Sequence, residues 1–76
     1  MKEFDEYRGY KLAPVPYETP LGRWAVAVNI SRKSGYTTRE KIFYEEGNIM
    51  YLLEEEAKKE AFVFGKRVID EGLVGF

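Results

Sequence analysis

The clearest helical pattern in the chain lies between residues 52 and 72. At about 100° per residue, a core-facing helix repeats its apolar side chains at intervals of three and four. One stripe of this kind contains Leu53, Ala57, Ala61, Phe64 and Val68, with Gly65 beside it. The spacing predicts one amphipathic helix from about 50–53 to about 71, and Gly72 suits the left-handed position after a helix end.

The start of this helix has two interpretations. Asn48 could cap a helix that begins early, or Gly47 and Asn48 could form a turn before a short extended segment at 49–51. Within the helix, Ala57, Ala61 and Gly65 form a row of small residues at four-residue spacing. Such a row favours a close approach of the helix backbone to a sheet.

Strict alternation of large and small residues marks a strand at 23–31. The large residues are Trp24, Val26, Val28 and Ile30, and they alternate with Ala25, Ala27 and Asn29. An alternation of period two predicts a strand with one buried face. We expect the large set to face the helix and the alanines to point outward.

Two weaker strands complete a predicted sheet. One spans 7–13 and ends at Pro14 and Pro16, which cannot donate to a sheet ladder. The segment 14–22 is then a loop. The other strand spans 36–45 and forms a hairpin with 23–31 through a polar turn at 31–35. Its register is ambiguous, and we favour Phe43 on the inner face, with Ile42 and Tyr44 on the other.

These elements predict an α+β fold of β-β-β-α order in one domain, residues 1–76. It is a three-stranded antiparallel meander with one C-terminal helix packed on one face. Residues 1–6 are expected to fray unless Phe4 docks. The expected core consists of Leu12, Trp24, Val26, Val28, Ile30, Phe43, Leu53, Ala57, Ala61, Phe64 and Val68.

Several short motifs are spread along most of the chain. They are Gly-Tyr-Lys-Leu-Ala-Pro at 9–14, Gly-Arg-Trp at 22–24, Glu-Glu-Ala at 55–57, Phe-Gly-Lys at 64–66 and Ile-Asp at 69–70. In this pattern the chain resembles small uncharacterised bacterial domains of β-β-β-α type. The resemblance implies the same fold. It implies no activity, because that family has none assigned.

Composition removes most kinds of catalytic chemistry. The 76 residues include no cysteine and no histidine, so thiolate nucleophiles, disulfides and the commonest general base are excluded. Glu54, Glu55 and Glu56 are consecutive helical residues that diverge by about 100° each, so they cannot converge on one metal ion. We therefore expect no enzyme activity, no metal site and no cofactor.

Charge and hydropathy limit the partners and the location. Lys and Arg number 12 against 13 Asp and Glu, a net charge of -1 that offers no global attraction for nucleic acid or anionic membrane. No apolar run approaches the roughly 18–20 residues of a membrane span. Residues 1–6 are charged with no apolar segment behind them, so we expect no signal peptide and a cytoplasmic protein.

The hairpin at 32–41 is a candidate nucleic-acid surface. Basic and aromatic side chains could bind phosphates beside a stacked base, and they are Arg32, Lys33, Tyr36, Arg39 and Lys41. Against this interpretation, the outward residues of the central strand are two alanines and an asparagine, which give no aromatic platform. We regard nucleic acid as the weaker hypothesis.

A protein-interaction or self-association module is the stronger hypothesis. Outward alanines flanked by tyrosines would give a smooth apolar surface for a protein partner or a second copy. A second candidate surface lies on the far side of the helix, where Phe62 and Ile69 share one line and Leu73 and Phe76 follow the helix end. Either the chain's own ends cover this second surface, which we favour, or it contacts a partner.

Overall fold

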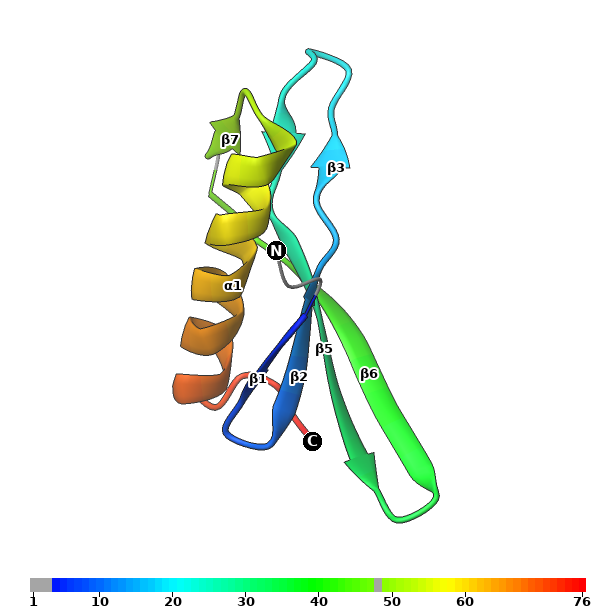
Figure 1. Cartoon of the computed structure of the whole chain (residues 1–76). Helices are drawn as coiled ribbons and strands as arrows, with labels where there is room; N and C mark the ends of the chain where they lie inside the picture. The colour runs from blue at the N-terminus through cyan, green and yellow to red at the C-terminus, as the bar shows by residue number, and fades with distance from the viewer. Residues whose placement is uncertain (1–3, 48) are drawn as a thin grey trace.

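The computed structural model describes residues 4–47 and 49–76. It has the order β1 (Asp5–Tyr7), β2 (Tyr10–Pro14), β3 (Tyr17–Glu18), β4 (Trp24–Ala25), β5 (Ala27–Ser34), β6 (Thr37–Tyr44), β7 (Met50–Tyr51) and α1 (Glu54–Asp70). The α+β class, the antiparallel pairing and the single C-terminal helix are confirmed (Figure 1). The three-stranded meander is wrong, because the seven strands form two sheets, β1-β2-β5-β6 and β3-β4-β7.

The two sheets share continuous stretches of chain. The central stretch is formed by β4, Val26 and β5, residues 24–34. On one side of it, Pro14 pairs with Val28 and Tyr17 pairs with Ala25, so the register does not change between β2 and β3. Pro16 lies between them and has no N–H for the ladder. On the other side, Ala27 pairs with Tyr44 but Ala25 pairs with Met50, four residues later than the register of β6 would give. The Glu45 N–H still donates to the Val26 carbonyl, so the break between β6 and β7 follows Glu45.

The predicted first strand is in fact a hairpin. Tyr7 pairs with Tyr10, and the two residues between them, Arg8 and Gly9, have φ values of 51° and 83°. Two positive φ angles in a two-residue loop are the signature of a type I′ hairpin turn. Asp5 and Glu6 are consequently in a strand and not in a frayed end, while residues 1–3 lie outside the described residues. The prolines do not end the strand, since β2 includes Pro14 and β3 follows.

The second hairpin turns later than predicted. β5 continues through Arg32 and Lys33 to Ser34, which pairs with Thr37. Gly35 has a φ of 61° and opens the two-residue turn, as a type II′ hairpin requires. The expected polar turn at 31–35 is therefore wrong. Residues 31–34 continue the strand, and the turn itself consists of Gly35 and Tyr36.

The helix begins at Glu54 after an extended Leu53 whose φ is -114° and ψ is 139°. Met50 and Tyr51 form β7, which agrees with the extended segment of the second interpretation; Asn48, the alternative cap, lies outside the described residues. Because Leu53 precedes the helix, its side chain is 60% exposed and not in the core. Without it, the buried stripe is centred further toward Gly65 and Ile69.

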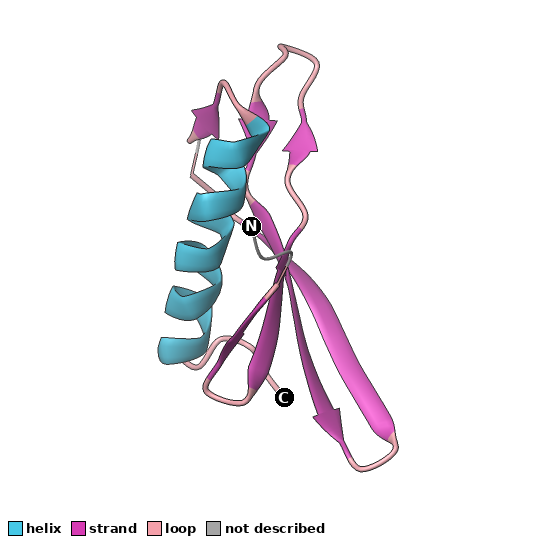
Figure 2. Cartoon of the chain, in the orientation of Figure 1, coloured by secondary structure: helices cyan, strands magenta, loops and turns pink. Residues whose placement is uncertain are grey.

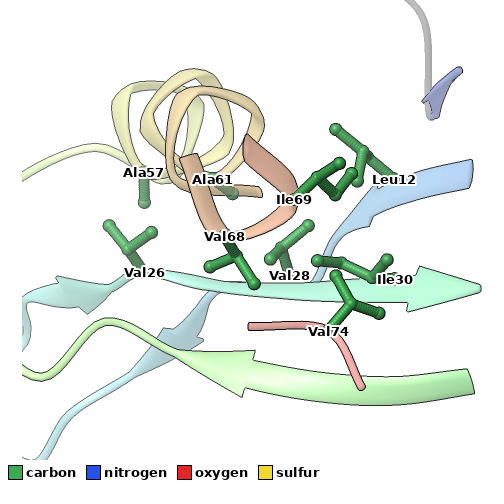
Figure 3. Close-up of a cluster of buried hydrophobic side chains, with 9 residues drawn as sticks. All are labelled: Leu12, Val26, Val28, Ile30, Ala57, Ala61, Val68, Ile69 and Val74. Atoms are coloured by element: carbon green, nitrogen blue, oxygen red, sulfur yellow. The ribbon is translucent and has the colours of Figure 1, made fainter. Parts of the chain in front are cut away.

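The core lies between α1 and one face of β2, β4 and β5 (Figures 2 and 3). Val26, Val28 and Ile30 point toward the helix, as the alternation predicted. Trp24, Phe43 and Phe64 are partly buried against this cluster. The sequence did not predict Ile69 and Val74, which complete it. The buried members are Leu12, Val26, Val28, Ile30, Ala57, Ala61, Val68, Ile69 and Val74.

Candidate functional site

The face of the sheets turned away from α1, called here the outer face, carries an apolar surface. Its rows follow from the strand register and from the Val15 N–H that donates to the Ala27 carbonyl over 2.9 Å. Side chains in one row lie on the same side of a sheet. The three rows are Ala13–Asn29–Ile42, Val15–Ala27–Tyr44 and Tyr17–Ala25–Met50.

Two tyrosines contact each other across the central alanines. The rings of Tyr17 and Tyr44 are edge to face, with centroids 5.9 Å apart and an interplanar angle of 74°. Tyr17 pairs with Ala25 on one side of the central stretch, and Tyr44 pairs with Ala27 on the other. Ala25 and Ala27 are 7% and 0% exposed although they point away from the helix. The small residues therefore let the tyrosines form a ridge over the central stretch.

A shallow hollow of about 370 Å³ adjoins this ridge. Four side chains from β3, β6 and the segment before β3 line it, and each is only partly covered. Their exposed fractions are 37% for Val15, 46% for Tyr17, 43% for Ile42 and 56% for Tyr44. An apolar hollow with partly exposed aromatic walls is typical of a surface that binds another apolar group.

Asn29 is a polar group within this apolar surface. Its Nδ2 donates to Glu40 Oε2 over 3.4 Å. Its Oδ1 is buried and accepts no hydrogen bond from the described residues. A buried acceptor without a donor costs free energy. The buried Asn29 Oδ1 is thus an acceptor that no donor of the described residues satisfies.

The apolar surface ends where charged rows begin. Toward the β5–β6 turn, the next row of the outer face is Glu6–Lys11–Ser31–Glu40, and Lys33 opposite Thr38 follows. Acidic and basic side chains alternate there. The apolar surface therefore has a charged border of mixed sign, as the polar rim of a protein interface has.

The five residues of the predicted nucleic-acid surface do not share one face. Lys41 pairs with Ile30, whose side chain points toward α1, and Arg32 and Arg39 pair with each other two residues further along the strands. All three side chains therefore leave the sheet on the same side as α1. Lys33 leaves on the outer face, opposite Thr38. Tyr36 is in the turn and fully exposed. The structure therefore brings Arg32 and Arg39 together with Lys41 in the next row of the same face, and it places Lys33 and Tyr36 elsewhere.

The predicted surface beside the helix is not one open patch. Ile69 is buried in the core, Phe62 and Phe76 are partly buried against it, and Leu73 is 61% exposed. The tail after α1 turns back toward the core at the end of the helix. There the Gly72 N–H donates to the Ile69 carbonyl and the Leu73 N–H donates to the Val68 carbonyl. These two bonds form a Schellman motif. Val74 then enters the core.

The acidic side chains at the helix start interact with a lysine of the same helix. Lys58 Nζ lies 3.3 Å from Glu54 Oε1 and 4.0 Å from Glu55 Oε1, as expected of neighbours on a helix surface. Within residues 4–47 and 49–76, no group of three or more acidic side chains is placed to hold a metal ion. In the same part of the chain, no helix has the length and apolar content needed to cross a membrane.

Two ionisable groups of the described residues have shifted pKa values. Burial raises the pKa of the Tyr51 hydroxyl above its ordinary 10.0, and the carboxylates of Glu60, Glu56 and Glu45 act in the same direction. The pKa of Arg8 is raised by its hydrogen bond and charge interaction with Tyr7, and then by Asp70. Both shifts move titration further from neutral pH, so neither group becomes a better acid or base there.

Sequence reasoning missed half of the hollow. Ile42 and Tyr44 were predicted to share a face, but Val15 and Tyr17 were assigned to a loop because two prolines flank Val15. Their spacing of two residues was the available signal. No family model, no curated protein and no solved structure matches this chain.

Proposed function

We propose that this protein is a non-enzymatic, cytoplasmic protein-interaction module that associates with a second copy of itself through the outer face. The observation that carries the proposal is the apolar hollow beside the Tyr17–Tyr44 ridge. It lies on the face opposite the one that α1 covers. Residues of this kind, partly exposed and aromatic, are enriched at protein interfaces.

A second copy suits this surface because a two-fold contact must be complementary to itself. The ridge and the hollow share residues and are adjacent on one face. A two-fold axis between them, lying in the plane of the interface, places the ridge of each copy over the hollow of the other. Two stacked sheets with interdigitating inner side chains form a stable layer in many proteins.

The dimensions of the molecule are sufficient for such a contact. The Cα trace extends 42 Å along its longest axis and 25 and 18 Å across it. A standard interface buries about 800 Å² on each partner. A face that runs along the strands is large enough for that area, with the apolar rows at its centre and the charged rows at its border.

Sedimentation equilibrium on matched lysine variants tests the proposal. The Ile42→Lys substitution places a charge in the hollow, and we expect dimer dissociation to become at least about tenfold easier, since tenfold corresponds to about 1.4 kcal/mol. Val63→Lys makes a similar change at a 60% exposed position of α1, outside the buried stripe, and serves as the control. Circular dichroism checks that both variants fold.

Three results of this experiment have different consequences for the proposed dimer. A wild-type dimer that Ile42→Lys dissociates and Val63→Lys leaves intact supports the outer face as the contact. A protein that stays monomeric from roughly 1 µM to 1 mM, the range of weak complexes, refutes self-association. A dimer that tolerates Ile42→Lys places the contact elsewhere.

A further inference from the structure

Two arginines face each other across the β5–β6 hairpin, and neither forms an ion pair within the part of the chain that the structure describes. Arg32 pairs directly with Arg39. Directly opposite residues of an antiparallel pair have Cβ atoms about 4.5–5.5 Å apart, and like charges in such positions are destabilising. Both side chains leave the sheet on the α1 side, where the hairpin extends beyond the C-terminal end of the helix (Figure 1).

Nearby carboxylates interact with other groups. Asp70 accepts a hydrogen bond from Tyr7 and lies 3.0 Å from Arg8 Nε. Glu40 leaves the sheet on the outer face and accepts from Asn29. Among the described residues, neither Arg32 nor Arg39 forms an ion pair. The two positive charges are therefore balanced by no acidic side chain of that part of the chain.

Arg32 is held in place by an aromatic pair. Its Nη1 donates to the Tyr10 hydroxyl over 3.3 Å, and its guanidinium carbon lies 5.4 Å from the Tyr10 ring centroid. The Tyr10 hydroxyl donates in turn to the main-chain oxygen of Phe76, and the two rings meet edge to face at 6.2 Å. An arginine held in this way has less conformational freedom to lose when it binds an anion.

A small hollow of about 200 Å³ lies beside the arginine pair. Its lining is Arg32, Ser34, Arg39 and Phe76, with no acidic residue. Ser34 adds a hydroxyl donor on the same face as Arg32, two residues further along β5. The volume is below the roughly 300–1,000 Å³ of pockets that enclose drug-sized ligands. It suits one oxyanion group with an apolar substituent against Phe76.

We infer that Arg32, Arg39 and Ser34 bind a phosphate group, carried as a phosphate monoester or free in solution. Guanidinium groups bind phosphate oxygens through paired, charge-assisted hydrogen bonds. A doubly charged phosphate between the two arginines also removes their mutual repulsion. The site lies on the α1 side of the sheet and is separate from the outer face, so it does not depend on the proposed dimer.

The test is a comparison of two charge-matched variants. Arg39→Gln removes one member of the pair, and Lys33→Gln removes one positive charge from the same hairpin on the opposite face. The melting temperature and the backbone amide NMR shifts are followed during titration with sodium phosphate, and with sodium chloride at equal ionic strength. At ten times its Kd, phosphate should raise the melting temperature by roughly 6–11 °C.

We expect this rise, with shifts centred on Arg32, Ser34 and Arg39, in the wild type and in Lys33→Gln but not in Arg39→Gln. Without phosphate, Arg39→Gln should melt no lower than the wild type, because a like-charge pair has been removed. Arg39→Lys should bind more weakly than the wild type, since an ammonium lacks the paired donors. An equal effect of chloride, or an unchanged response in Arg39→Gln, would overturn the inference.

Two further ligands distinguish the source of the phosphate. Phenyl phosphate that binds more tightly than inorganic phosphate identifies a monoester with an apolar group, and equal binding identifies free phosphate. A single-stranded RNA oligonucleotide is the third probe. RNA binding that needs Lys33 and Tyr36 as much as Arg39, with a steep dependence on salt, would replace this site with a nucleic-acid surface.

Discussion

Small side chains decide how closely α1 lies on the sheet. Ala57 and Ala61 are fully buried, and Gly65 lies in the same row. A Cβ added at Gly65 would lie 3.2 and 3.3 Å from the two Cδ atoms of Leu12 and 3.3 Å from Val28 Cγ2. The space between α1 and the sheet is thus already filled by the side chains of the sheet. A larger residue in this row must displace them.

Ala61→Leu tests this packing. The added atoms have no free space, so we expect the free energy of unfolding to fall by about 1–3 kcal/mol, the usual cost of overpacking. Urea denaturation measures the change. Val63→Leu is the control, because Val63 is 60% exposed and the substitution alters only the solvent side of α1. Equal stability of Ala61→Leu and wild type would show that the row is not closely packed.

At the scale of the elements, the β1–β2 hairpin attaches the N-terminal segment to the helix. The Tyr7 hydroxyl donates to Asp70 over 2.9 Å, and Asp70 also lies 3.0 Å from Arg8 Nε. Lys66 Nζ lies 3.7 Å from Asp5 Oδ2. All of these groups are at least partly exposed, and exposed ion pairs contribute little. The contribution of the hairpin therefore depends mainly on the turn that forms it.

Gly9→Ala tests the turn. Gly9 has a φ of 83°, and a left-handed conformation costs an alanine roughly 1–2 kcal/mol. A Cβ at this position would meet no atom within 4 Å, so a loss of stability would report the backbone conformation alone. Gly47→Ala is the control: its Cβ would meet only ordinary contacts of 3.6 Å or more, and its φ is not positive. If both variants unfold alike, the turn is not under this constraint.

Elements that depend on local sequence patterns could be predicted from the sequence. Elements that depend on contacts between distant parts of the chain could not. The helix and the central alternation of Trp24 to Ile30 were predicted because both are repeated over many neighbouring residues. β3 and β7 have two residues each and depend on their pairing with β4. The sequence therefore left the extended segment at 49–51 as one of two alternatives and placed β3 in a loop. The two hairpin turns depend on Gly9 and Gly35, and single glycines were weak signals within longer polar or alternating stretches.

The candidate surfaces were predicted to a similar extent. The outward alanines and the shared face of Ile42 and Tyr44 follow from alternation. Val15 and Tyr17, which line the same hollow, have the same two-residue spacing, but Pro14 and Pro16 favoured a loop there. Ile69 is buried in the same cluster as Val74, which the tail brings back to the core after the helix end. This burial is a tertiary feature, which the spacing of apolar residues within the helix does not predict.

At the scale of the whole molecule, the two faces of the sheets differ in what covers them. One face is covered by α1 and the tail, and it contains the fully buried core. The other has an apolar centre with a ridge and a hollow, and charged rows border it toward the β5–β6 turn. A domain of this size buries only about 60–65% of its unfolded surface. A second copy on the outer face would add a second layer to a thin core.

Isotope-filtered NOE spectroscopy tests this arrangement most directly. A mixture of ¹³C-labelled and unlabelled protein reports only contacts between two copies. A dimer formed through the outer face should give cross-peaks from the ring protons of Tyr17 or Tyr44 in one copy to the methyl groups of Val15 or Ile42 in the other. A spectrum without such cross-peaks at millimolar concentration, or with cross-peaks only from the exposed side of α1, would contradict this arrangement.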